Sequence, residues 1–170
     1  SGEGGDESFA GYGRYRTGAV ERLFKSIAFP GTGGFRSRGD LRGGATRQLL
    51  GDKLTQVGRA WRGELIESWR SYPAAWTPLQ KMQALDLQHA LPDNLLVKAD
   101  RMLMAHGVEG RMPFVDRRVV SWGLAAADAL KCDRREGKKI LKNWASGFMP
   151  AEHFAAKKRG FYVPVNDWWR

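Results

Sequence analysis

Apolar side chains between residues 54 and 90 recur mostly every three or four positions, which is the period of an α-helix. The recurring residues are Trp61, Leu65, Trp69, Leu79, Met82, Leu85 and Leu87. The Tyr72-Pro73 and Thr77-Pro78 steps interrupt this pattern, because a residue before proline disfavours the helical backbone. The pattern therefore predicts packing helices that are separated by residues 72–78.

A further helix is predicted to begin at Pro92 and Asp93, which are typical of a helix start. Its expected buried stripe consists of Leu95, Leu96, Ala99, Met102 and Leu103. After it, Asp116 is expected to be the N-cap of another helix, because a carboxylate can accept from the first free backbone N–H groups. That helix would carry Val119, Val120 and Leu124.

Residues 19–52 are rich in Gly and Arg, and pairs such as Gly33-Gly34 and Gly43-Gly44 predict breaks between short helical pieces. No internal repeat and no low-complexity linker is present. Read by periodicity alone, the chain is mainly α-helical. A length of 170 residues fits one domain with a sizeable core.

The charge of the chain is strongly positive, with a formal net charge of +10 at pH 7. Such a balance ordinarily favours an acidic partner such as nucleic acid or an anionic membrane. The basic residues are scattered, however, without the interleaved aromatic residues of a single-strand binder. We therefore expect no nucleic-acid partner, although charge alone keeps it as an alternative. No apolar run is long enough to cross a bilayer, so we expect no membrane partner either.

Cysteine usage bears only on the compartment. The single Cys132 cannot form an internal disulfide, and no Cys/His spacing fits a structural zinc site. Both observations agree with a reducing environment, and the predicted localisation is cytoplasmic.

The first residues of the chain contain three closely spaced glycines, Gly2, Gly4 and Gly5. Glycine lets the backbone adopt positive φ and lets a ligand approach main-chain N–H groups that a Cβ would shield. The turn therefore suits a phosphate or a nucleotide. The alternative is a polar loop that only feeds a helix.

The same stretch contains three carboxylates, Glu3, Asp6 and Glu7, with no cation before Arg14. Acids at a place that suits an anionic ligand would repel it unless a divalent metal is bound between them. Mg²⁺ is the natural candidate for such a metal.

Five segments of the chain are similar, in order, to motifs of one protein family. They are residues 1–15 (SGEGGDESFAGYGRY), 91–101 (LPDNLLVKADR), 104–116 (MAHGVEGRMPFVD), 137–142 (GKKILK) and 158–168 (KRGFYVPVNDW). Together they resemble the asparagine synthetase domain, which is the ATP-pyrophosphatase part of glutamine-dependent asparagine synthetases and related amide-forming enzymes. One such match would be weak, whereas five in family order are specific.

The resemblance implies that residues 1–170 are the C-terminal part of an α/β domain with an adenine-nucleotide α-hydrolase-like (ATP-pyrophosphatase) fold. The sequence contains no SGGxDS pyrophosphate loop. That loop, the parallel sheet and the N-terminal glutaminase domain of the family are therefore expected upstream. We expect the 170 residues alone to be inactive, and the resemblance leaves a homodimer open.

The resemblance also implies a reaction, in which aspartate is converted to asparagine through β-aspartyl-AMP with glutamine-derived ammonia, using ATP and Mg²⁺. Two alternatives stay open. One is a related amidotransferase that acts on another carboxylate, for instance in the decoration of a cell-surface sugar or peptide. The other is a non-catalytic interaction protein.

Carried over residue by residue, the resemblance implies roles for the first motif and for Lys138. Glu3 stands at the position linked to formation and use of the acyl-adenylate, and Asp6 at the acid on the Mg²⁺–pyrophosphate side. Lys138 matches the lysine that contacts phosphate, although a slip of one residue would give this role to Lys139. Four positions would line the ATP site, namely Ser1, Gly2, Gly4 and Gly5.

Glu109 and Arg111 are candidates for substrate contact, because in an extended segment they project to one face. An arginine there could bind a substrate carboxylate with two hydrogen bonds, or the two residues could simply hold the loop. The chain also departs from the family pattern near these motifs. Ser8 replaces Leu or Val, Ala10 replaces Gly, Met102-Leu103 replaces Ala-Ser, and Gly110 replaces Val.

Overall fold

The computed structural model describes residues 1–35 and 44–155, and in this part of the chain the backbone forms helices and turns without a strand. The α-helices are α1 (Gly5–Ser8), α2 (Ala19–Ala28), α3 (Gly44–Ser71), α4 (Pro78–Leu85), α5 (Val97–Met104), α6 (Arg117–Ala125), α7 (Asp128–Lys131), α8 (Lys139–Ala145) and α9 (Ala151–Ala155). Two 3₁₀ turns, η1 (Gly13–Tyr15) and η3 (Pro113–Val115), and a π-helix, η2 (Asp86–Leu96), complete the described elements. The prediction of a mainly helical chain is confirmed for these residues. The segment 158–168 lies outside them.

Two compact units make up the chain, Ser1–Ile140 and Leu141–Arg170. The first contains every described candidate site residue. In the second, the rings of Trp144 and Phe148 pack edge to face with their centroids 4.6 Å apart. Among the described helices, none combines the length and the apolar composition that a bilayer crossing requires.

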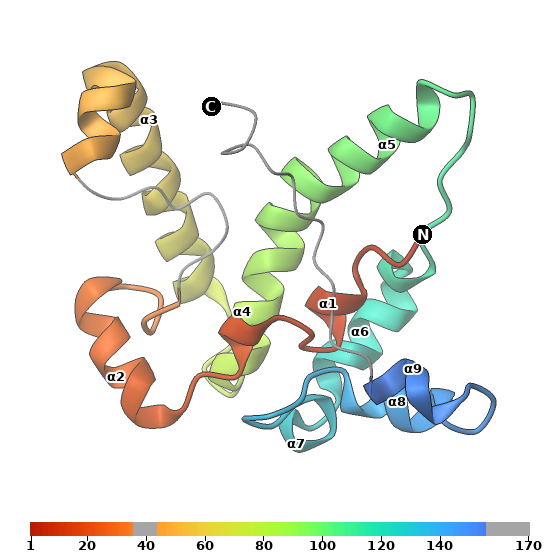
Figure 1. The fold of residues 1–170 in the computed structure, drawn as a ribbon. Helices are drawn as coiled ribbons and strands as arrows, with labels where there is room; N and C mark the ends of the chain where they lie inside the picture. Colours follow the sequence, from red (N-terminus) through yellow and green to blue (C-terminus); the bar gives the residue numbers. More distant parts are fainter. Residues whose placement is uncertain (36–43, 156–170) are drawn as a thin grey trace. The chain divides into compact units, whose positions relative to one another are not determined.

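A long helical run dominates the first unit. It consists of α4, η2 and α5, which follow one another without interruption (Figure 1). The run starts with a capping box, in which Thr77 Oγ1 accepts from the backbone N–H of Gln80 and Gln80 Oε1 accepts from that of Thr77. These reciprocal bonds satisfy backbone donors that no residue inside the helix can satisfy. The predicted break at residues 72–78 is thereby confirmed.

The predicted helix start at Pro92 is wrong, because Pro92 lies inside the π-helix η2. A proline in an ordinary α-helix loses a hydrogen bond and collides with the preceding turn. The wider turn of a π-helix provides another way to accommodate such a disruption without ending the helix. Sequence spacing alone does not reveal this option.

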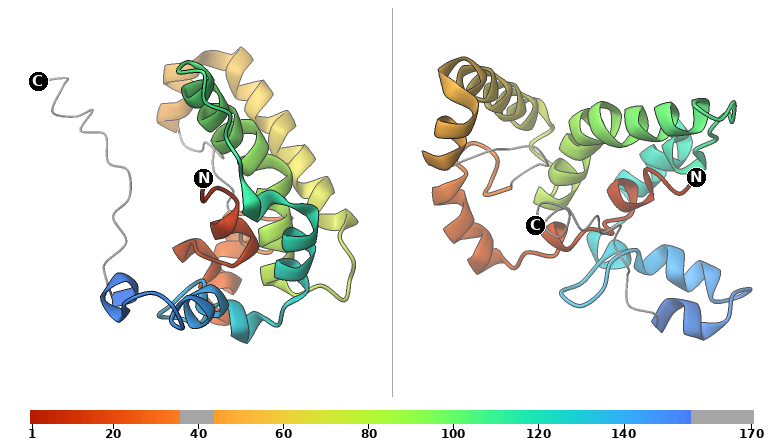
Figure 2. Two further views of the ribbon diagram at one scale, coloured as in Figure 1. Left: turned by 90° about the vertical axis from the view of Figure 1, so that its right-hand side faces the viewer. Right: turned by 45° about the horizontal axis from the view of Figure 1, so that its top comes forward.

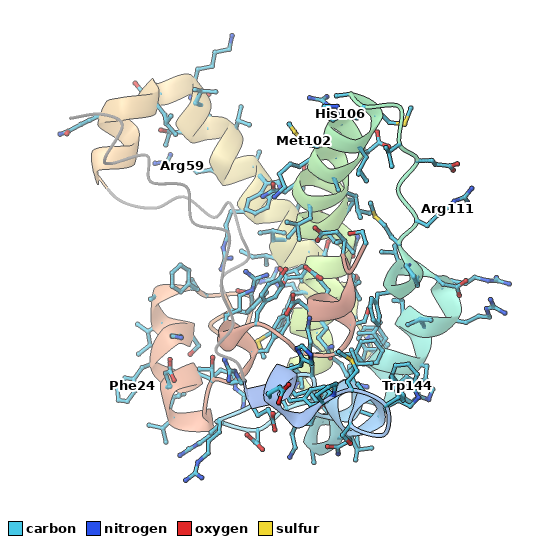
Figure 3. All side chains as sticks on the ribbon, turned by 45° about the vertical axis from the view of Figure 1, so that its right-hand side comes forward. Phe24, Arg59, Met102, His106, Arg111 and Trp144 are labelled. Atoms are coloured by element: carbon cyan, nitrogen blue, oxygen red, sulfur yellow. The ribbon has the colours of Figure 1, made fainter. Side chains whose placement is uncertain are left out.

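The stripe expected on this helix is only partly correct. Leu95 is buried, whereas Met102 on α5 is 66% exposed (Figure 3). No residue of α5 is buried, since this helix makes its main element contacts with η2 rather than with the core. The helical periodicity was therefore right while the depth of burial was not.

The hydrophobic core joins the N-terminal segment to α3 and α4, whose arrangement is visible from two further sides in Figure 2. Trp61 and Trp69 pack against the core from α3 and are partly buried. The buried members are Ala10, Tyr15, Phe35, Leu65, Leu79, Met82 and Leu85. The apolar period read between residues 54 and 90 thus marks the side of α3 and α4 that faces this core.

The short helix α1 packs against both α4 and α6. Gly123 of α6 allows this closeness, because a Cβ there would lie 2.8 Å from the carbonyl oxygen of Ser8. The helix α6 begins at the predicted N-cap, where Asp116 Oδ1 accepts from the N–H of Arg118 at 2.8 Å. The Asp116 prediction is confirmed.

Candidate functional site

The glycine-rich turn leads directly into α1. Gly4, the N-cap of α1, has φ +87°, a conformation that favours glycine. A Cβ at Gly4 would also lie 2.8 Å from Val115 Cγ2, and one at Gly5 would touch the ring of Phe114. These two glycines therefore have a packing role, while around Gly2 a Cβ would meet nothing within 4 Å.

Residues 1–8 run beside the segment 111–115. The Ser1 nitrogen donates to the carbonyl oxygen of Arg111 at 2.8 Å, and Ser8 Oγ donates to that of Phe114 at 3.4 Å. Figure 1 shows the N-terminus next to the chain that leads into α6. The first and third motifs of the sequence, far apart along the chain, thus form one region.

Asp6 of the first motif meets Lys138 of the fourth, with 3.2 Å between Oδ1 and Nζ. Both side chains are partly exposed, at 22% and 31%. The neighbouring Lys139 instead pairs with Asp133, with 3.0 Å between Nζ and Oδ2. The structure therefore brings Lys138, and not Lys139, to the first motif.

Backbone contacts hold Lys138 at this place. Its N–H donates to the carbonyl oxygen of Phe9 at 3.1 Å. Lys138 and Ala10 both have φ +56°, a conformation that is unfavourable for residues other than glycine. Gly137 packs so tightly on Ala10 that a Cβ would overlap its carbonyl oxygen. The replacement of the family's glycine by Ala10 thus falls on a strained position beside the candidate site.

The three carboxylates of the first motif do not form a cluster. Glu7 is buried, and its Oε1 accepts from the hydroxyl of Tyr12 at 2.6 Å. Burial raises the pKa of Glu7 above its ordinary value. Within the described residues, no group of three or more His, Cys, Asp or Glu side chains could hold a metal. Glu3 and Asp6 are the partly exposed acids of this motif.

An ion pair between partly buried Arg14 and buried Asp86 was not anticipated from the sequence. Arg14 donates to Asp86 Oδ2 from Nη2 at 2.6 Å and from Nε at 3.2 Å, and the Tyr15 hydroxyl donates to the same oxygen. Burial raises the pKa of Tyr15 well above its usual range. Arg14 and Tyr15 belong to the first motif, and this was the available sequence signal for a role near the site. Asp86 lies among the periodic apolar residues 54–90, and nothing in the sequence singled it out.

Glu109 and Arg111 form an exposed ion pair, with 3.0 Å between Oε2 and Nη2. The Arg111 side chain is 82% exposed and that of Glu109 is 72% exposed (Figure 3). The carbonyl of Arg111 joins the first motif through Ser1. The structure therefore brings the Arg111 backbone, and not the exposed side-chain pair, to residues 1–8.

The Asp6 environment is compatible with Mg²⁺. This ion takes oxygen ligands and often uses one or two carboxylates together with water and substrate phosphates. Asp6 supplies one partly exposed carboxylate, which lies 3.2 Å from the ammonium of Lys138. A ligand that brings its own oxygen atoms could complete the coordination.

Comparisons with known proteins agree with the motif resemblance. A family model described as Asparagine synthase matches residues 1–170. Asparagine synthetase (glutamine-hydrolyzing) 1 of Bacillus subtilis is 27% identical over 197 aligned residues, which cover 99% of this chain and 31% of that protein. A putative asparagine synthetase (glutamine-hydrolyzing) of Mycobacterium bovis is 30% identical over 196 aligned residues, covering 100% of this chain and 30% of that protein. The chain thus spans about a third of the length of these relatives. No solved structure matches it.

Proposed function

Since the chain belongs to the asparagine synthase family, we propose that its protein forms an amide at the expense of ATP, converting aspartate to asparagine with glutamine-derived ammonia. The observation that carries this proposal is the meeting of Asp6 and Lys138, one from each of two separate family motifs, within 3.2 Å. The names of the curated relatives, which are glutamine-hydrolysing asparagine synthetases, support the same reaction class.

The reaction proposed has two steps. A carboxylate oxygen of aspartate attacks the α-phosphorus of ATP, and the bond to pyrophosphate breaks, which leaves β-aspartyl-AMP. The nitrogen of ammonia then attacks the acyl carbon, AMP leaves, and the nitrogen loses a proton. The first step brings anions together, so it needs cations where negative charge accumulates.

In the first step, Lys138 binds phosphate oxygens and stabilises the leaving pyrophosphate. To do so it would leave Asp6, and Asp6 is the residue that would then hold Mg²⁺. The metal, when bound, screens the charge of the phosphates. The partial exposure of both side chains supports this exchange, because neither has to emerge from the core.

For the second step, Glu3 is proposed as the group that accepts a proton from the attacking nitrogen. It lies in the turn before α1, and its side chain is partly exposed. A positioned carboxylate typically contributes a factor of about 10² to 10⁴ in rate. Ser1 and Gly2 would contact the nucleotide, with Gly4 and Gly5 shaping the turn.

Arg111 is proposed to bind the carboxylate of the amino-acid substrate, which would take the place of Glu109. The ion pair between these residues is exposed, and such pairs contribute only about 0 to 1 kcal/mol to stability. Replacing Glu109 by a substrate carboxylate would therefore cost little free energy. The hydrogen bond from Ser1 to the Arg111 carbonyl supports a location next to the nucleotide turn.

We propose further that these helices complete an ATP-pyrophosphatase α/β domain of a cytoplasmic enzyme. The helix α2 supports this, since it exposes an apolar stripe of the kind that packs on other elements. The stripe consists of Val20, Leu23, Phe24 and Ile27, which are 68–78% exposed. A parallel sheet and a glutaminase domain elsewhere in the protein belong to the same proposal.

A second candidate is an amidotransferase for another carboxylate. It is favoured by the segment beside Arg111, where Gly110 and Leu103 depart from the family pattern. A Cβ at Gly110 would lie 2.6 Å from Leu103 Cδ1, so the two departures are in contact. A change of shape next to the proposed substrate contact could admit a different acceptor.

The test is pyrophosphate release from ATP by the full-length protein with Mg²⁺ and ammonia, with and without aspartate. We expect steady-state, aspartate-dependent release, which requires both steps, to fall at least about a hundredfold in Glu3→Gln and Lys138→Met. The matched control is Lys139→Met, which should stay close to wild type because Lys139 faces Asp133. Release with a different carboxylate would favour the second candidate, and no release with any carboxylate would favour an interaction protein.

A further inference from the structure

The carbonyl groups at the end of α1 need partners from outside the helix. The last carbonyls of any helix lack an intrahelical donor, and α1 has only four residues. The carbonyl of Asp6 accepts from the N–H of Gly11 at 2.8 Å, and that of Phe9 accepts from the N–H of Lys138. Between these two, the carbonyls of Glu7 and Ser8 both point to one side chain of α4.

That side chain is Gln83, which is fully buried. Its Nε2 donates to the carbonyl oxygen of Glu7 at 2.7 Å and to that of Ser8 at 2.8 Å. Its Oε1 accepts from Lys131 Nζ at 2.9 Å. The orientation of the amide is determined by these partners, because the flipped amide would face two acceptors with its oxygen and an ammonium with its NH₂ group.

Lys131 is itself buried and held from three directions. Its Nζ donates to Gln83 and, at 3.3 Å, to the carbonyl oxygen of Leu124, and it lies 3.5 Å from Asp128 Oδ1. Asp128 Oδ1 in turn accepts from the hydroxyl of Thr77, the N-cap of α4. A buried charge is tolerated when it is paired and hydrogen-bonded in this way.

We propose that Gln83, supported by Lys131, is a positioning residue that fixes residues 7–8 and thereby sets the approach of Asp6 to Lys138. Asp6 precedes the two carbonyls that Gln83 holds, and Lys138 is bound to the carbonyl that follows them. Neither Gln83 nor Lys131 is exposed, so each acts through the backbone and not by contact with a ligand. The inference rests on the proposed function, in which Asp6 and Lys138 act together.

Gln83→Glu is the selective variant, because a carboxylate still accepts from Lys131 but cannot donate to the two carbonyls when ionised. The matched control is Gln80→Glu on the same helix. It likewise removes one amide donor, the one that reaches the Leu124 carbonyl, but keeps the capping acceptor and does not touch α1. A second variant, Gln83→Met combined with Lys131→Met, removes donor and buried charge together in case Gln83→Glu does not fold.

Two measurements on the full chain separate positioning from general destabilisation. Amide hydrogen exchange at Gly11 and Lys138 should become at least tenfold faster in Gln83→Glu and in the double Met variant, while the amides of α4 change less than twofold. In a titration with Mg²⁺ alone, the carbon-13 signal of the Asp6 carboxyl should need at least fivefold more metal for half-saturation. Gln80→Glu should stay within twofold of wild type in both measurements.

Unchanged exchange at Gly11 and Lys138 in both Gln83 variants would overturn the inference, as would equal acceleration in Gln80→Glu or throughout α4. Failure of the proposed function gives a different result. If Asp6 of the wild-type chain does not respond to Mg²⁺, its role as a metal ligand is wrong, and the exchange data alone decide whether Gln83 positions the segment.

Discussion

The carboxylate of Asp6 and the ammonium of Lys138 meet over the α-carbon of Gly11, with 3.2 Å between Oδ1 and Nζ. A Cβ on Gly11 would overlap Asp6 Oδ1 and lie 2.5 Å from Lys138 Cε. The absence of a side chain at position 11 is therefore a condition for this ion pair. Because both obstructing atoms belong to side chains that can move, a substitution there disturbs the pair more than the fold.

Gly11→Ala should therefore separate activity from stability. We expect pyrophosphate release to fall at least about tenfold, because Asp6 and Lys138 are pushed apart and a displacement near 1 Å costs large factors in rate. The free energy of unfolding should change by less than about 1 kcal/mol, as the two side chains can rotate away.

The control for that substitution is Gly13→Ala, whose Cβ would only approach Arg16 Nη2 at 3.4 Å. Steady-state kinetics and urea unfolding on both variants provide the comparison. Full activity in Gly11→Ala would show that the meeting of Asp6 and Lys138 does not matter for the reaction.

Lys138→Met should bind Mg²⁺ more tightly in the absence of ATP, even though we expect it to be inactive. In the proposed site, Lys138 and the metal compete for the Asp6 carboxylate, so removal of the ammonium removes a competitor. We expect the Mg²⁺ dissociation constant, measured by calorimetry without nucleotide, to fall at least about threefold, which corresponds to about 0.7 kcal/mol.

Lys139→Met is the matched control for the metal titration. It removes the same charge from the next residue, and Lys139 pairs with Asp133 instead of Asp6. Equal affinities in the two variants would mean that Lys138 does not compete for Asp6. Weaker Mg²⁺ binding in Lys138→Met than in wild type would contradict the proposal that Asp6 exchanges Lys138 for the metal.

Local patterns predicted the helices well, whereas pairings between distant segments were not predictable. Thr77 followed by Pro78 and Gln80 contains the whole signal for a capping box, and the structure forms it. The helix start predicted at Pro92 was wrong, because the rule applies to α-helices and Pro92 lies inside a π-helix. The burial of Gln83 and Lys131 depends on contacts among α1, α4 and α7, and residue spacing within one segment cannot predict such contacts.

The site shows the same division. The first motif pointed to Asp6, and the fourth to Lys138, but only the folded chain distinguished Lys138 from Lys139. Charge in the sequence suggested three acids at one place, while the side chain of Glu7 turns inward to Tyr12. The sequence proposes which residues carry the chemistry, and the folded backbone decides which of these candidates meet.

Lys131 should make stability depend on pH in the alkaline range. Burial lowers the pKa of Lys131 below its ordinary value of 10.5, so the unfolded chain binds this proton more tightly than the folded chain. Where the unfolded state holds more protons, the free energy of unfolding rises with pH. The contribution of Lys131 should thus grow as pH passes the lowered pKa and level off above about 10.5.

The measurement is urea unfolding of wild type and Lys131→Met between pH 7 and pH 11. The stability of wild type relative to the variant should increase with pH. Lys98→Met, at an exposed position of α5, corrects for the loss of one positive charge. A difference that stays constant or declines over this range would show that the charged form of Lys131 is not penalised by the fold.

Leu103 and Gly110 should be energetically coupled, because the space that a side chain at position 110 would need is occupied by Leu103. A Cβ there would lie 2.6 Å from Leu103 Cδ1. The family pattern has Ser where this chain has Leu103, and Val where it has Gly110. This chain therefore has a larger side chain at position 103 and a smaller residue at position 110. Gly110→Val alone should cost about 1 to 2 kcal/mol through overpacking.

Leu103→Ser alone should cost a similar amount, about 1 to 2 kcal/mol, because it removes a partly buried apolar side chain. In the double variant the new Val occupies the space that Leu103 vacated, so we expect it to be at least about 0.5 kcal/mol more stable than the sum of the single variants. Urea unfolding of all four proteins closes this cycle. Additive costs would mean that the two departures arose independently. Positive coupling would identify them as one compensated change beside Arg111, and the double variant should then be tested for a shift in acceptor preference.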